Sequence, residues 1–127
     1  MLADFPSIPI LLSTDMAESK RFYQDTLGLP LLNETDERMV FKCGGDTRLI
    51  VSRSSVGTSD TQTQMVWRVP DIHAALEDLR ARGVHIERYT APDPVTDSDG
   101  IADMGHSWAA WFIDPSRNVL SVIEPKG

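Results

Sequence analysis

Three histidines are the side chains of this chain that could act as general bases near neutral pH. His73 follows the expected start of a helix and should lie on its solvent face, and His85 follows Gly83 on an expected short strand. His106 ends the longest irregular segment and lies near a plausible cavity mouth. No carboxylate partner for His106 is evident from the sequence, so it is a catalytic candidate whose structural reading stays open.

The irregular segment at residues 90–106 is rich in aspartate and could bind a cation. It contains Asp93, Asp97, Asp99 and Asp103. Residues 97–100, Asp-Ser-Asp-Gly, are similar to part of a calcium loop. However, Val95 and His106 stand where an EF-hand needs acidic residues. We interpret the segment as a solvated acidic loop that is either a functional lid or mobile.

Composition narrows the possible partners. The chain has 127 residues and a formal net charge of −7, which argues against nucleic acid as a partner. Its longest apolar run, residues 8–12, is too short to span a bilayer, and residues 1–8 lack the basic start of a signal peptide. Cys43 is the single cysteine, so an internal disulfide is excluded. No neighbouring residue would activate its thiol, so we do not expect Cys43 to be catalytic. We expect a cytoplasmic protein that binds neither nucleic acid nor membrane.

The elements that must position these residues repeat one pattern twice. An apolar run is followed by Asp15, an amphipathic stretch and Gly28, and the same order returns at Asp71 and Gly83. The aspartates can cap helices and the glycines can end them. Such a duplication indicates two copies of one supersecondary unit. We predict a single α+β domain over residues 1–127, with two βαβββ modules at about 7–54 and 63–125.

Local patterns place the elements of each module. In the first helix Asp15 and Glu18 match a capping box, and Gly44-Gly45 matches a two-residue hairpin turn. Residues 54–62 form a polar connector between the modules. The expected strands are residues 7–14, 29–33, 38–43, 47–53, 64–69, 84–89, 107–113 and 118–124.

Two motifs resemble those of a known family. Residues 19–29 contain Phe-Tyr followed by Leu-Gly, and residues 112–118 read Phe-Ile-Asp-Pro-Ser-Arg-Asn. Together they resemble the glyoxalase/bleomycin resistance/dioxygenase superfamily, the vicinal oxygen chelate proteins. The family usually has glycine where this chain has Arg117, a difference expected to change the turn geometry. The resemblance implies two modules whose sheets curl into a half-open mixed barrel, often paired with a second chain, so we expect a homodimer.

The resemblance also provides a test for metal. Metal-dependent members place four His, Gln or Glu ligands on the first and last strands of each module, and these positions fall on Ile8, Ile50, Gln64 and Ser121. Isoleucine has no donor atom, and shifting the register by one residue does not supply the missing donors. We therefore expect neither a metal nor another cofactor.

The same four positions mark the concave face of the predicted barrel, because side chains alternate along a strand. Trp111 is expected opposite Ser121 on this face, and Trp67 in the core. An arginine there could hold a carboxylate or phosphate. Equally, the arginines could point to water and Trp111 could fill the barrel. The predicted ligand-binding residues are Met39, Phe41, Arg48, Ile50, Gln64, Arg68, Trp111 and Ser121.

Three functions remain open from the sequence. The first is a metal-free protein that binds a small organic molecule, a drug or metabolite, in the cavity; the acidic composition would suit a cationic ligand. The second is a metal-dependent lyase, isomerase or dioxygenase with displaced ligands, in which His106 would matter. The third is a structural or regulatory dimer with a vestigial pocket.

Overall fold

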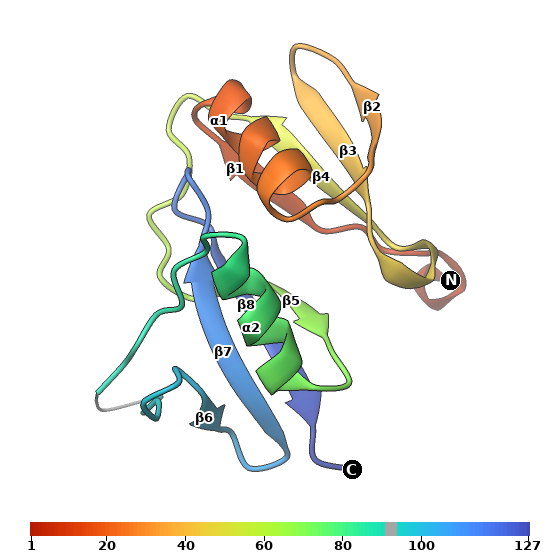
Figure 1. Cartoon of the computed structure of the whole chain (residues 1–127). Coiled ribbons are helices and arrows are strands. Elements are labelled where there is room, and N and C mark those ends of the chain that lie inside the picture. Colours follow the sequence, from red (N-terminus) through yellow and green to blue (C-terminus); the bar gives the residue numbers. More distant parts are fainter. Residues whose placement is uncertain (91–93) are drawn as a thin grey trace.

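The computed structural model describes residues 1–90 and 94–127 and contains two four-stranded mixed sheets, one from each half of the chain (Figure 1). The first sheet has the order β1-β4-β3-β2, from β1 (Ile10–Ser13), β2 (Leu31–Glu34), β3 (Arg38–Lys42) and β4 (Arg48–Arg53). The second has the order β5-β8-β7-β6, from β5 (Thr63–Arg68), β6 (Ala102–Asp103), β7 (Ser107–Ile113) and β8 (Val119–Pro125). This confirms the predicted α+β fold with the order βαβββ in each half; the sheets do not close into a barrel.

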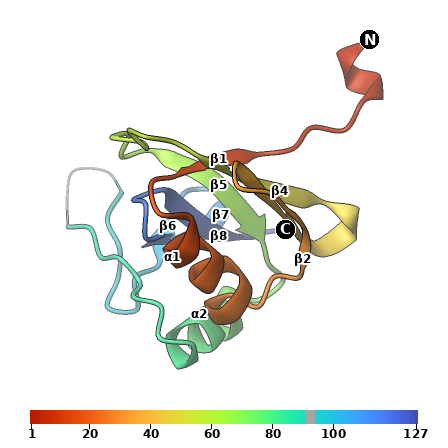
Figure 2. The ribbon, with the colours of Figure 1, turned by 90° about the horizontal axis from the view of Figure 1, so that it is seen from above.

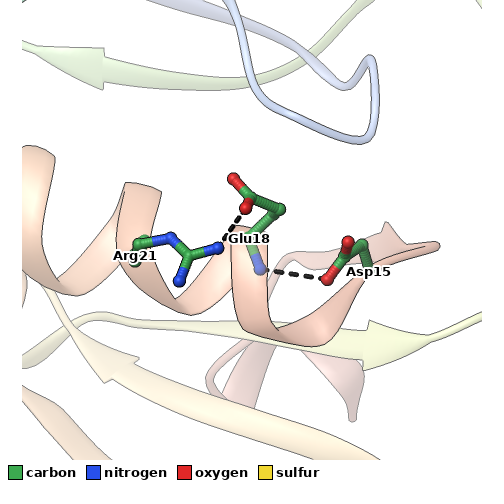
Figure 3. A network of polar contacts seen from close by, with 3 residues as sticks. All are labelled: Asp15, Glu18 and Arg21. Atoms are coloured by element: carbon green, nitrogen blue, oxygen red, sulfur yellow. Dashed lines mark hydrogen bonds and ion pairs between the residues drawn. The ribbon is translucent and has the colours of Figure 1, made fainter.

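The helix of each half begins at the predicted aspartate. α1 (Met16–Lys20) continues as a π-helical segment, Arg21–Thr26, and α2 spans Ile72–Ala81. The Asp15 side chain accepts a 3.1 Å hydrogen bond from the Glu18 backbone N–H, and Asp71 does the same for Ala74 at 3.2 Å. The Glu18 carboxylate does not complete the capping box; it pairs with Arg21 one turn later (Figure 3). Both helices end at glycines with positive φ, as expected for Gly28 and Gly83.

The two helices cover the same side of the strands, and the N-terminal segment extends away from the body (Figure 2). The main core lies between the helices and the sheets. Its fully buried members include Tyr23, Phe41, Leu76, Phe112 and Leu120. Within the described part of the chain, neither helix has the length and apolar character needed to cross a membrane.

Two local predictions were wrong. Residues 84–89 form no strand; Val84 and Ile86 are buried, and the fourth strand of the second sheet is the short β6 instead. The segment therefore follows the sheet without joining it, and only the Glu87 N–H bonds to the Trp111 carbonyl, at 2.8 Å. The first hairpin turns through the longer segment Gly44–Asp46 and not through a two-residue Gly44-Gly45 turn, and both Gly45 and Asp46 adopt the left-handed conformation in it. Pro92 and Asp93 of the predicted irregular segment lie outside the described residues.

The turn between β7 and β8 ties the second half of the chain to the first. The Asn118 side-chain amide donates to the Leu12 carbonyl at 2.7 Å and to the Asp114 carboxylate at 2.8 Å. The Thr14 backbone N–H donates to the Ser116 hydroxyl at 3.0 Å. These buried and partly buried bonds explain why the Asp-Pro-Ser-Arg-Asn motif occurs at this turn: its polar side chains bond to the backbone at the end of β1 and to one another.

Candidate functional site

The face of each sheet turned away from the helices is called here its outer face. In the second sheet the pairing puts Val66 beside Ser121, and Ser121 opposite Trp111. Their neighbours Trp67 and Phe112 lie on the helix-covered side, where the two rings stack 6.0 Å apart. The predicted register of Trp111 is therefore confirmed, and so is the core position of Trp67.

Trp111 is held in place on the outer face by two contacts. Its indole N–H donates to the Thr63 hydroxyl at 2.9 Å, and its ring meets the Tyr89 ring edge to face, with centroids 5.7 Å apart. Trp111 belongs to a small apolar cluster that is separate from the main core. The buried members of this cluster are Ala102, Ala109, Trp111 and Val119. The indole is therefore fixed by packing and by a hydrogen bond, with one side left beside a cavity.

That cavity, called here the tryptophan cavity, has a volume of about 520 Å³. None of the described residues that line it carries a formal charge at neutral pH. Burial raises the pKa of the Tyr89 hydroxyl, and the Glu87 carboxylate adds to the effect, so this phenol stays protonated and can donate a hydrogen bond. The lining residues are Thr61, Gln62, Thr63, Tyr89, Pro94, Met104, Trp111 and Val119.

The prediction that Met39 and Phe41 lie on the concave face was wrong. Met39 pairs with Val51 and Phe41 with Leu49, so all four share the helix-covered side of the first sheet. Met39 is 1% exposed and Phe41 is fully buried, against Tyr23. The error was one of register: Val40, not its neighbours, pairs with Ile50.

The other predicted residues occupy outer faces, but they do not gather at the cavity. Arg48 and Ile50 lie on the outer face of the first sheet and Arg68 near the end of β5. Ser121 is buried opposite Trp111, and its hydroxyl donates to the Ala110 carbonyl at 2.9 Å. Among the described residues, Trp111 is the predicted ligand-binding residue that lines the tryptophan cavity.

A β-bulge explains why sequence reasoning selected Gln64 and missed Thr63. The pairing of β5 with β8 shifts between Thr63 and Met65, which places Thr63 opposite Val119 on the outer face. The Gln64 side-chain amide instead forms hydrogen bonds at the bulge: its oxygen accepts from the Val119 N–H at 2.8 Å and its nitrogen donates to the Thr58 hydroxyl at 3.1 Å. Tyr89 and Met104 were missed because they come from irregular segments without a period to reveal their direction.

The four positions that carry metal in some family members do not fit a metal here. Ile8 and Ile50 have no donor atom, and the polar atoms of Gln64 and Ser121 are already hydrogen-bonded. Across residues 1–90 and 94–127 there is no group of three or more His, Cys, Asp or Glu side chains that could hold a metal ion.

The candidate general bases and nucleophile lie outside the cavity lining. His73 and His85 are exposed, and His85 lies 3.2 Å from the Glu87 carboxylate. His106 is exposed in the connection between β6 and β7 and is not among the described residues that line the tryptophan cavity. Burial raises the pKa of the Cys43 thiol, which is the opposite of what an activated nucleophile needs.

The fold defines the class of small α+β proteins built from tandem βαβββ modules. The family model of the Glyoxalase/Bleomycin resistance protein/Dioxygenase superfamily matches residues 9–122, and the chain belongs to this superfamily. A search among curated proteins gave no match.

Solved structures of similar fold cover nearly the whole chain. The bleomycin resistance determinant encoded on the transposon Tn5 is 17% identical, with a TM-score of 0.73 over 97% of this chain and 99% of that one. TnmS3, an antibiotic binding protein from Streptomyces sp. CB03234, is 21% identical, with a TM-score of 0.71 over 96% of each chain. A putative glyoxalase family protein from Bacillus anthracis is 15% identical, with a TM-score of 0.70 over 96% of this chain and 97% of that one. At these identities the likeness concerns the fold.

Proposed function

We propose that this protein binds a small organic molecule, a drug or metabolite, in the tryptophan cavity without using a metal. The observation that carries the proposal is the cavity itself, of about 520 Å³, whose described lining residues are uncharged and include an aromatic corner formed by Tyr89 and Trp111. Ligand pockets in proteins have volumes of roughly 300–1,000 Å³ and combine apolar walls with a few polar groups. A flat ligand would stack on the indole while the Thr61, Gln62 and Thr63 side chains supply hydrogen bonds.

The absence of a metal from the proposed mechanism rests on the donor set. A catalytic ion of this family would need ligands at Ile8 and Ile50, which offer none, and would have to displace existing hydrogen bonds at Gln64 and Ser121. The proposal therefore contains binding and sequestration, and no bond is made or broken in the ligand.

The similar structures support the drug-binding form of this proposal. One is described as an antibiotic binding protein and another as a bleomycin resistance determinant. A role in antibiotic resistance, exerted by sequestering the drug in the cytoplasm, agrees with this fold and with the cavity.

We further propose that the protein acts as a homodimer. Two large apolar side chains on the outer faces of edge strands are open to solvent, Ile10 on β1 at 59% exposure and Val66 on β5 at 45%. Contiguous exposed apolar patches are typical of protein interfaces, and the proposed interface takes these two side chains as parts of one such patch. A second copy that covers these outer faces would also enclose the tryptophan cavity, which lies on the same face of the second sheet.

The test uses two tryptophans of the same strand. Trp111→Ala removes the wall of the cavity, whereas Trp108→Ala removes an indole that pairs with the Lys126 ammonium at the other end of β7. Binding of a panel of planar aromatic drugs is measured by thermal shift and isothermal titration. We expect Trp111→Ala to weaken every ligand found by at least tenfold and Trp108→Ala to leave its affinity unchanged. Equal affinities in the two variants would refute the assignment of this cavity.

A further inference from the structure

A second cavity of about 240 Å³, called here the arginine cavity, adjoins the tryptophan cavity. The two share the lining residues Thr61, Tyr89 and Val119, so they form adjacent chambers of one trough. Among residues 1–90 and 94–127, no charged residue lines the tryptophan cavity, whereas three line the arginine cavity: Asp60, Glu87 and Arg117. A ligand long enough to fill both chambers would meet aromatic rings at one end and charges at the other.

The three charged groups are not equally available to a ligand. The Glu87 carboxylate lies 3.2 Å from the His85 ring nitrogen, and the Asp60 carboxylate accepts a 3.0 Å hydrogen bond from the Gln62 backbone N–H. The Arg117 guanidinium makes no ion pair and donates no hydrogen bond within residues 1–90 and 94–127. The cation is therefore the charged group of this cavity that has no partner in the described chain.

Arg117 also stands at a position that does not favour arginine. Its φ is +72°, in the left-handed region that side chains other than glycine adopt at a cost. The turn imposes this conformation, because the Asp114 carboxylate accepts from the Ser116 and Asn118 N–H groups and the Asp114 carbonyl from the Arg117 N–H. A strained backbone conformation that persists beside a cavity is typical of a residue whose side chain has a function.

We propose that Arg117 binds an anionic group of the ligand, so that the trough takes an aromatic molecule bearing a carboxylate, sulfonate or ionised phenol. This inference rests on the proposed function, because it assigns the ligand class of the same site. A guanidinium offers a planar pair of N–H donors that suits a carboxylate or sulfonate. The ligand charge inferred here is opposite to the one that the acidic composition of the chain suggests, because the anionic group would pair directly with the Arg117 guanidinium, whereas the Asp60 and Glu87 carboxylates of the same cavity already have partners in Gln62 and His85.

Two fluorescent probes that differ in one anionic group test the inference. Anilinonaphthalene sulfonate is an aromatic anion, and N-phenylnaphthylamine is its uncharged counterpart. We expect Arg117→Gly to weaken sulfonate binding by about three- to tenfold and to leave the uncharged probe unchanged. Because glycine accepts the left-handed conformation, the same variant should raise Tm, by about 2–4 °C. A residue with a purely structural role would show no such opposite changes in affinity and stability.

Two control variants separate this effect from strain and from overall charge. Asp46→Gly relieves the other non-glycine residue with positive φ in the described part of the chain, at +61° in the exposed first hairpin, and should leave both probes unaffected. Arg21→Gln removes a cation from the helical face and should do the same. Unchanged sulfonate affinity in Arg117→Gly, or a lowered Tm, would overturn the inference while leaving the cavity assignment intact. If Trp111→Ala weakens neither probe, the proposed function itself fails.

Discussion

The Tyr23 hydroxyl donates a 2.6 Å hydrogen bond to the Asp114 carboxylate, joining the π-helical segment of the first half of the chain to the β7–β8 turn of the second. Both residues are almost completely buried. The tyrosine and the aspartate belong to the two motifs by which the sequence resembles its family. The bond therefore gives those motifs a physical role, which is to fix the two βαβββ modules relative to one another.

Replacing Tyr23 with phenylalanine should destabilise the protein by about 1–3 kcal/mol. The ring would still fill its place, but the buried Asp114 carboxylate would lose one donor. Urea unfolding followed by circular dichroism measures the change. Tyr89→Phe provides the control, because that residue is only partly buried and its hydroxyl has no hydrogen-bond partner in the described chain. Similar losses for the two variants would contradict the special role of the Tyr23 bond.

Stability should fall at alkaline pH because of the same tyrosine. Burial, and then the charge and hydrogen bond of Asp114, raise the pKa of Tyr23 far above its ordinary value of 10.0. Above about pH 10 the unfolded chain loses this proton and the folded chain keeps it, so the free energy of unfolding decreases by up to about 1.4 kcal/mol per pH unit. Below pH 10 the group causes no pH dependence. Tyr23→Phe should flatten this decline in the free energy of unfolding with pH. An unchanged slope between pH 9.5 and 11 would contradict the assignment of the decline to Tyr23.

Much of the fold could be predicted because its signals are local. Asp15, Asp71, Gly28 and Gly83 cap helices by rules that depend on a few neighbouring residues. The failure at residues 84–89 has the opposite cause: an apolar run that is buried beside a sheet is indistinguishable from one that pairs with it. The pairing of β7 in the structure shows that β6, and not residues 84–89, forms the edge strand beside it.

The glycine that ends α2 offers a test of these local rules. Gly83 has φ +85°, and a Cβ at this position would meet no atom within 4 Å. Gly83→Ala should therefore cost about 1–2 kcal/mol through backbone conformation alone. Gly44→Ala is the matched control, with equal space and no left-handed φ, and should change stability by less than about 0.5 kcal/mol. Equal effects in thermal unfolding would show that the helix end tolerates a side chain.

If the homodimer forms through the outer faces, one added charge should disrupt the dimer on an outer face and have no effect elsewhere. Val66→Asp places a carboxylate on the outer face of β5 and should shift the mass by light scattering from twice toward once the chain mass of 14.1 kDa. Val56→Asp makes the same change in the connector between the modules, where the side chain is 85% exposed, and should leave the mass unchanged. A monomeric wild-type protein at micromolar concentration would contradict the dimer proposal.

The candidate site was less predictable than the fold, for reasons visible in single residues. Trp111 was found because hairpin register and strand alternation determine its face. Met39 and Phe41 were misplaced by one position of register, which inverts every side chain of a strand. Thr63 was hidden by a bulge, and Tyr89 and Arg117 come from a non-periodic segment and a turn, where no sequence period indicates direction.

The most direct test of a metal-free binding site is the metal content of protein purified without a chelator, measured by plasma mass spectrometry together with Tm in added nickel, manganese, zinc and ferrous iron. We predict well below one metal ion per chain and no rise in Tm, because a ligand that binds only the folded state would raise it. A metal ion held near one per chain, with a raised Tm, would contradict the account and would require donors other than Ile8, Ile50, Gln64 and Ser121.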